Sequence, residues 1–184
     1  LAERGNEHRR VETKAWEVPE LRYYSEVYVH ADAIHHALEP FFEYINASDP
    51  ERQFKEFLAQ HAANIDWWYK NGDQGKEHFA VPYTNLQGEP ALFYVDFIVK
   101  FKSGKIGLFD TKTKRSDQEA PNKHNALVAY MEQENAANPD RQLIGGVLIR
   151  EELSGVITFR YCSNRIENTN DLTGWNFLNP AELA

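Results

Sequence analysis

Apolar positions begin to recur at helical spacing shortly after residue 48. Ser48 and Glu51 have the spacing of a capping box, in which an N-cap serine is followed three positions later by a glutamate. The apolar residues that follow at intervals of three and four are Phe54, Phe57 and Leu58. This pattern predicts a helix from about residue 49 to residue 62, with one apolar face.

Aromatic and β-branched runs predict strands through the middle of the chain. The first is Ile65-Asp66-Trp67-Trp68-Tyr69, after which Asn71-Gly72 predicts a turn. Three further apolar runs cover residues 79–83, 92–101 and 105–111. The gap at Ser103-Gly104 is short, so the last two runs are expected to form a hairpin.

The last third of the chain predicts one helix and two strands. Residues 122–137 have helical spacing, with Ala126, Leu127 and Tyr130 on one face. Residues 143–150 are almost continuously apolar, as expected of a strand covered on both faces. A final strand is expected over 155–161. The order of elements predicts an α/β sandwich with a mixed sheet.

The first 47 residues follow a different pattern. Residues 22–29 alternate aromatic and polar side chains as a short strand does, and residues 31–45 look helical except at Pro40. We expect an arm or linker segment, residues 1–47, packed on a single domain of residues 48–184. The chain of 184 residues has the length of one ordinary domain.

Composition narrows the classes of protein that fit. No run of 18 apolar residues exists, so no membrane-spanning helix is expected. A single cysteine, Cys162, excludes an internal disulfide and a cysteine-rich zinc site, and it favours a cytoplasmic protein. The only methionine is Met131, which suggests a piece of a longer polypeptide.

Charge is distributed unevenly along the chain. The net charge of −8 argues against a stand-alone nucleic-acid binder. Residues 96–127, however, hold seven Lys or Arg against four acids, a local charge of +3. A basic segment in an acidic domain suits contact with phosphate when other parts of a larger protein hold the substrate. A solvated strand edge protected by lysines explains it equally well.

Two acids and a lysine lie at the ends of predicted strands. Asp96 interrupts an otherwise apolar run, and Asp110 and Lys112 close the next one. Side chains alternate along a strand, so Asp110 and Lys112 project the same way, roughly 7 Å apart. If the two runs pair as a hairpin, Asp96 comes close to Asp110.

This trio has the chemistry that phosphodiester hydrolysis requires. Two carboxylates can hold Mg²⁺, which prefers oxygen ligands, and the ion polarises the phosphate and activates water. A neighbouring lysine can orient the nucleophile or offset charge on the phosphate. The spacing alone is weak evidence, because Asp-x-Lys is common and an acid in a strand can simply face solvent.

An ordered set of four motifs makes the signal more specific. The chain resembles the C-terminal endonuclease domain of type III restriction subunits, and equally the nuclease domains joined to superfamily 2 helicases. The resemblance covers residues 48–130. The motifs that carry it are Trp67-Trp68-Tyr69-Lys70-Asn71, Phe79-Ala80-Val81-Pro82-Tyr83, Tyr94-Val95-Asp96-Phe97-Ile98-Val99 and Leu108-Phe109-Asp110-Thr111-Lys112.

The resemblance implies a PD-(D/E)xK nuclease with a restriction-endonuclease-like sandwich, a central mixed β-sheet flanked by helices. Its implied activity is Mg²⁺-dependent DNA endonuclease, with Mn²⁺ as a substitute. The family's two acids fall on Asp96 and Asp110, which would bind metal, and its lysine falls on Lys112. The implied partners are DNA, an ATP-dependent helicase or translocase portion of the same longer chain, and a modification subunit.

Four further residues match positions of the family or could contact nucleic acid, and most of them also have a simple structural explanation. The family's helix glutamate falls on Glu51, which its place in the capping box explains equally well. Lys70, Lys114 and Lys123 are candidate nucleic-acid contacts. An exposed lysine before a turn is the simpler interpretation of Lys70, and a surface lysine near a helix start explains Lys123 as readily.

The chain departs from the family pattern at two positions. Val95 replaces the usual proline, and Asp110 replaces a glutamate and is one methylene shorter. These departures and the acidic net charge keep a second hypothesis open, a degenerate nuclease fold that positions nucleic acid without cutting it. A third is an unrelated α/β domain with a buried Asp96–Lys112 ion pair.

Overall fold

A central mixed sheet organises the part of the chain that the structure describes. The computed structural model describes residues 15–20, 28–30, 36–38, 42–44, 47–113 and 117–183. Within these residues the sheet has six strands in the order β10-β9-β8-β7-β6-β3. Their bounds are β3 (Ile65–Lys70), β6 (Phe97–Phe101), β7 (Ile106–Lys112), β8 (Leu143–Leu153), β9 (Val156–Tyr161) and β10 (Asn176–Phe177).

Strand directions follow from the connections. β6 and β7 are antiparallel and joined by the tight turn at Ser103-Gly104, as predicted. β7 and β8 are parallel, because α2 (Ala120–Ala137) connects them. The other neighbours in this sheet, β3 with β6, β8 with β9 and β9 with β10, are antiparallel. The predicted fold class, α/β with a mixed central sheet, is confirmed.

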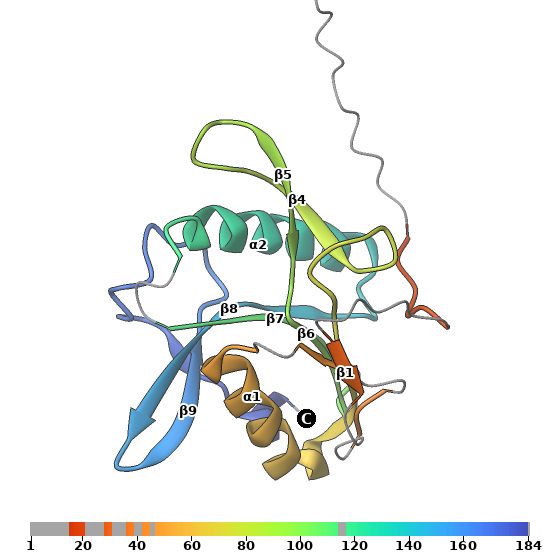
Figure 1. Cartoon of the computed structure of the whole chain (residues 1–184), viewed down its shortest axis with the longest axis vertical. Helices are drawn as coiled ribbons and strands as arrows, with labels where there is room; N and C mark the ends of the chain where they lie inside the picture. Colours follow the sequence, from red (N-terminus) through yellow and green to blue (C-terminus); the bar gives the residue numbers. More distant parts are fainter. Residues whose placement is uncertain are drawn as a thin grey trace, which may run out of the picture.

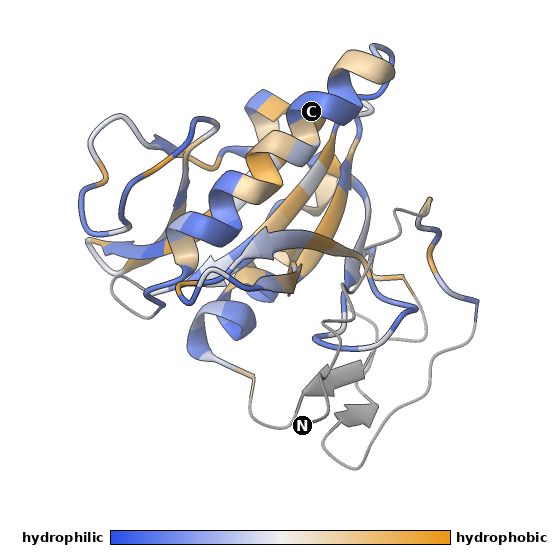
Figure 2. Ribbon diagram, turned by 90° about the horizontal axis from the view of Figure 1, so that it is seen from above, coloured by the Kyte–Doolittle hydropathy of each residue, from blue (hydrophilic) through white to orange (hydrophobic). Residues whose placement is uncertain are grey.

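The two main helices cover opposite faces of the sheet (Figure 1). Strand side chains alternate between these faces. Phe97 and Phe109 pack with Phe54 of α1 (Asp49–Gln60), whereas Ile98 and Leu108 pack with Leu127 of α2. The strands between the helices accordingly form the most hydrophobic layer of the molecule (Figure 2). This layering leaves the strand ends as the places where charged side chains can gather.

The start of α1 is confirmed as a capping box. The Ser48 side chain accepts a hydrogen bond from the Glu51 N–H at 3.4 Å, and a Glu51 carboxylate oxygen accepts one from the Ser48 N–H at 2.9 Å. Phe54 and Leu58 are buried on the side that faces the sheet. The cap therefore fixes both the beginning of α1 and the position of Glu51. A short 3₁₀ helix, η1 (Ala62–Asn64), joins α1 to β3.

The predicted strand over residues 92–101 is two strands. β4 (Ala80–Thr84) and β5 (Pro90–Tyr94) form a separate antiparallel hairpin, and β6 begins only at Phe97. Asn71 does not open a tight turn, since β3 pairs with β6 and a loop of residues 71–79 leads to β4. Residue periodicity cannot show this break, because apolar side chains continue through it from the hairpin into the sheet.

The β4–β5 hairpin is fastened to the start of α2. The Tyr83 hydroxyl donates to Glu119 at 2.7 Å, and the Asn122 side chain donates to the Thr84 carbonyl at 3.1 Å. Val81 and Phe93 contribute the buried apolar side chains of the hairpin to the core shared with α2. The hairpin projects beyond α2 in Figure 1.

The predicted helix over residues 31–45 is wrong where the structure describes it. β2 (Phe42–Tyr44) is a strand that pairs antiparallel with β1 (Tyr28–His30). Ala37 forms a parallel bridge with Trp68, which gives the outer edge of β3 a backbone partner. The rest of that expected helix, and residues 22–27 of the expected strand, lie outside the described residues.

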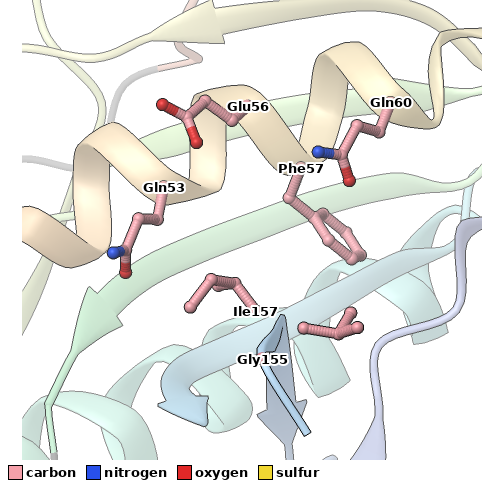
Figure 3. A pocket seen from close by; sticks show the side chains of 7 residues that line it. Gln53, Glu56, Phe57, Gln60, Gly155 and Ile157 are labelled. Carbon is pink, nitrogen blue, oxygen red and sulfur yellow. The ribbon is translucent and has the colours of Figure 1, made fainter. Parts of the chain in front are cut away.

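The C-terminal end adds elements that the sequence pattern did not indicate, β10 and α3 (Pro180–Leu183). No helix in the described part of the chain is long and apolar enough to cross a membrane. A pocket of about 300 Å³ lies between α1 and the β8–β9 turn, and Gln53, Phe57 and Ile157 are among its lining residues (Figure 3). None of the predicted site residues lines this pocket.

His124 joins α2 to the sheet through its neutral ring. The residue is fully buried, its Nδ1 accepts from the Val147 N–H at 3.1 Å, and its Nε2 donates to the Asn164 carbonyl at 2.8 Å. A Cβ on residue 146 would lie 2.5 Å from the ring, so glycine is required there. Burial lowers the pKa of His124 below its ordinary 6.5.

This lowered pKa predicts a loss of stability in acid. Below pH 6.5 His124 binds a proton in the unfolded chain but stays neutral in the folded protein. Its contribution to the free energy of unfolding is therefore present above pH 6.5 and is lost as pH falls through the folded pKa. Urea unfolding at pH 7 and pH 5 measures the change in the free energy of unfolding on acidification. The unchanged protein should lose more of this free energy, or gain less, than His124→Gln, and equal changes in both proteins would contradict the assignment.

Candidate functional site

Five charged side chains gather where β3, β6 and β7 stop pairing. Asp110 and Lys112 end β7, Lys70 ends β3, Asp96 directly precedes β6, and Glu51 lies in the first turn of α1. The register pairs Phe97 with Phe109. Continued by one residue, that register puts Asp96 beside Asp110, as the hairpin prediction required.

Asp110 and Lys112 form a buried ion pair along one strand. The Lys112 Nζ lies 3.0 Å from Asp110 Oδ2 and donates a hydrogen bond to Oδ1 at 3.2 Å. The Asp110 side chain is only 3% exposed. Burial and the charge of Asp96 raise the pKa of Asp110 to about 7, although Lys112 opposes that rise. Burial lowers the pKa of Lys112, but Asp110 and Asp96 outweigh it, so the net pKa is raised.

Asp96 is held by the residue between Asp110 and Lys112. Its Oδ2 accepts hydrogen bonds from the Thr111 N–H at 2.7 Å and from the Thr111 hydroxyl at 2.8 Å. Its Oδ1 lies 3.6 Å from the Lys70 Nζ. One carboxylate oxygen is thus fixed by β7, while the other is directed toward a cation.

Lys70 lies inside this cluster, so the expectation of an exposed lysine before a turn is wrong. Its side chain is 13% exposed, and its Nζ lies 2.9 Å from Glu51 Oε1 and 4.8 Å from the centre of the Phe97 ring. Burial lowers the pKa of Lys70, but Asp96 and Glu51 raise it further than burial lowers it. The ammonium therefore lies between two carboxylates, one in α1 and one directly before β6.

Glu51 caps α1, as the capping-box spacing predicted, and it also contacts the charged cluster. Its Oε2 accepts from the Ser48 N–H and caps α1, while its Oε1 faces Lys70. Burial raises the pKa of Glu51, but Lys70 and the hydrogen bonds with Ser48 outweigh burial and lower it. The helix cap therefore positions the Glu51 carboxylate at the edge of the cluster.

Lys123, another basic candidate, forms its ion pairs outside these five residues, although its charge lowers the pKa of Asp110. Lys123 pairs with Asp117 at 2.7 Å and with Glu119 at 3.9 Å, and it lies 5.8 Å from the centre of the Tyr83 ring. It therefore belongs to the group of contacts that fastens the β4–β5 hairpin to α2. Lys114 lies outside the described residues.

The donor set suits a hard divalent cation. Asp110 Oδ2 is buried and accepts no hydrogen bond, although Lys112 lies in ion-pair contact with it. Asp96 Oδ1 also faces a cation. Carboxylate oxygens on adjoining strands are the ligands Mg²⁺ prefers. Among the described residues, no three His, Cys, Asp or Glu side chains are already grouped as metal ligands, and two lysines lie against these acids instead.

Two residues that hold the site were missed by sequence reasoning. Thr111 fixes Asp96, a role hidden by its place on the opposite face of β7 from Asp110. Asn71 is buried, its amide nitrogen donates to the carbonyls of Phe79 and Val95, and its amide oxygen accepts from the Phe79 N–H. Its backbone N–H also donates to the Asp96 carbonyl at 3.0 Å. No spacing signal marks either role.

The fold and the site together define an α/β protein with a mixed sheet whose strand ends carry a cluster of carboxylates and lysines. The model of the YagJ family matches residues 48–145, just over half of the 184 residues, and this chain belongs to that family. The matched segment contains Glu51, Lys70, Asp96, Asp110 and Lys112. No curated protein and no solved structure gives a significant match to the chain.

Asn71 is expected to contribute strongly to stability because it satisfies three buried backbone groups. Asn71→Ala leaves those groups without their partner and should lower the free energy of unfolding by about 3 kcal/mol. Urea denaturation monitored by tryptophan fluorescence measures the change. Asn85→Ala is the matched control, since the Asn85 side chain also bonds to backbone groups but accepts from two N–H groups in an exposed turn. Equal losses in both variants would contradict this role.

Proposed function

We propose that this chain is a Mg²⁺-dependent endonuclease domain of the PD-(D/E)xK type that hydrolyses phosphodiester bonds in DNA. The observation that carries the proposal is the convergence of Asp96, Asp110 and Lys112 at the ends of two paired strands. A metal-dependent nuclease of this type requires two carboxylates and a lysine to lie together, and this arrangement supports the proposal.

Asp96 and Asp110 would hold the metal through the oxygens that hydrogen bonds leave available. When bound, Mg²⁺ supplies polarisation of the phosphate and a lowered pKa for the attacking water. Thr111 keeps the Asp96 carboxylate in one orientation through two hydrogen bonds, so only Asp110 and a lysine need to adjust. The pKa of Asp110 near 7 allows this carboxyl to lose its proton at neutral pH.

Lys112 is assigned an electrostatic role. The neighbouring acids raise its pKa, so Nζ stays protonated and does not act as a base at neutral pH. It is partly exposed, whereas Asp110 beside it is buried. An ammonium in this position can contact a phosphate oxygen and offset the charge that develops there.

The charge of the chain indicates how DNA would be held. The basic segment at residues 96–127 supplies local phosphate contacts, but the net charge of −8 opposes tight binding by the chain alone. We therefore propose that an ATP-dependent helicase or translocase portion of a longer cytoplasmic chain delivers the DNA, as in type III restriction enzymes. A modification subunit would then supply sequence recognition.

One observation favours a second candidate function, a nuclease fold that positions nucleic acid without cutting it. Lys112 pairs with Asp110 and Lys70 lies close to Asp96, so each acid already faces a cation. In a scaffold these pairs would be permanent. In a nuclease at least one of them must open when the metal binds, and cleavage assays separate the two functions.

The catalytic prediction concerns the three convergent residues. Asp96→Asn, Asp110→Asn and Lys112→Met should each reduce Mg²⁺-dependent cleavage of plasmid DNA by at least about 100-fold, because each removes a charge at the reacting phosphate. Circular dichroism should show that the variants remain folded. Nicking and linearisation on agarose gels measure the rate.

The matched controls change the same residue types at exposed positions, Asp140→Asn and Lys76→Met. Both should cut DNA as the unchanged protein does. Full cleavage by Asp110→Asn would overturn the assignment of the site. Lack of any divalent-dependent cleavage by the unchanged protein, alone and joined to its longer chain, would support the scaffold instead.

A further inference from the structure

Lys70 occupies the position that a bound cation would take between two acids. Its Nζ lies 2.9 Å from Glu51 Oε1 and 3.6 Å from Asp96 Oδ1, and it donates to the Asp96 backbone carbonyl at 3.4 Å. The β3–β6 register, with Lys70 opposite Phe97, brings the ammonium there. One lysine thus links α1 to the loop before β6.

The two carboxylate oxygens of Asp96 differ in their hydrogen bonds. Oδ2 accepts both hydrogen bonds from Thr111, so Oδ1 is the oxygen left for a cation. Lys70 is the cation that faces Oδ1 in this structure. A divalent ion that binds Asp96 through Oδ1 must therefore compete with the Lys70 ammonium for the same oxygen.

The charge of the cluster also indicates that a divalent ion and the Lys70 ammonium compete. Three carboxylates and two ammonium groups give a formal charge of −1 when all five are ionised. A divalent ion would change this to +1 in a largely buried site, where like charges repel strongly. The ammonium nearest to the ion is repelled most. Lys112 lies against Asp110, whereas Lys70 lies against Asp96 Oδ1, so an ion on that oxygen repels Lys70 directly.

We propose that Lys70 is an internal counter-cation that holds Glu51 and Asp96 together in the metal-free protein and is displaced from Asp96 Oδ1 when a divalent ion binds. Lys70 is thus a positioning residue that lowers metal affinity and prevents the acids from repelling one another before metal arrives. This inference rests on the proposed function, because that proposal places the ion at Asp96 and Asp110.

Lys70→Met keeps the apolar stem and removes the charge. Mn²⁺ titration by calorimetry should show binding on the order of tenfold tighter than in the unchanged protein, since competition and affinity are reciprocally linked. Lys70→Arg keeps the charge and should bind Mn²⁺ much as the unchanged protein does. Lys100→Met removes a half-buried ammonium at the other end of β6 and should leave Mn²⁺ affinity unchanged.

Thermal unfolding gives a second measurement on the same variants. In EDTA, Lys70→Met leaves two carboxylates without their partner and should melt about 10 °C lower than the unchanged protein. Saturating Mn²⁺ should recover most of that loss, because the ion takes the place of the ammonium. A fall in melting temperature that Mn²⁺ does not reverse would identify Lys70 as a structural ion pair and overturn the proposal.

The unchanged protein provides a test that does not depend on a variant folding. Reductive methylation followed by mass spectrometry measures how accessible the Lys70 amine is. Methylation of Lys70 should be faster when Mn²⁺ is bound, while that of Lys100, at the other end of β6, should not change. If calorimetry detects no Mn²⁺ binding to the unchanged protein, the proposed metal site fails. If Mn²⁺ binds but leaves Lys70 protected, only the displacement inference fails.

Discussion

The candidate site depends on the hydrogen bonds between Asp96 and Thr111. They connect the residue before β6 to the middle of the Asp-Thr-Lys segment of β7 at the point where the two strands stop pairing. A carboxylate that loses contact with water needs hydrogen bonds or an opposite charge. Thr111 provides the first and Lys70 the second, and together they position Asp96 beside Asp110.

The two-sided core explains why these charges lie at one end of the sheet. α1 and α2 bury the middle of β6 and β7 under aromatic and aliphatic side chains on opposite faces. Charged groups are excluded from those layers unless they are paired. The strand ends are the remaining positions, and α1 begins there because Ser48 and Glu51 cap it. Core packing and helix capping thus direct three acids to one region.

Electrostatic balance then determines the state of that region. Five ionisable groups share a largely buried space, so the pKa of each depends on the others. Burial and the charge of Asp96 raise the pKa of Asp110 to about 7. The lysines keep the acids from repelling one another. If the proposed divalent ion binds here, it must break an ion pair, and its affinity then depends on the position of a lysine.

The sequence by itself determined the features that depend on neighbouring residues. Periodicity and capping predicted α1, α2 and the strands β3, β7, β8 and β9 of the central sheet, with β6 as part of a longer run, and spacing singled out Asp96, Asp110 and Lys112. The α/β class with a mixed sheet followed from the order of these elements. Local pattern sufficed here because helix caps, strand alternation and tight turns are set by residues a few positions apart.

Only the tertiary structure decided which distant segments meet. β3 pairs with β6 rather than with the strand that follows it, and this pairing turns Lys70 from an apparently exposed lysine into the partner of Glu51 and Asp96. The division of residues 90–101 into two strands and the strand at residues 42–44 were decided in the same way. Such contacts depend on packing between residues far apart in the chain, so local periodicity does not predict them.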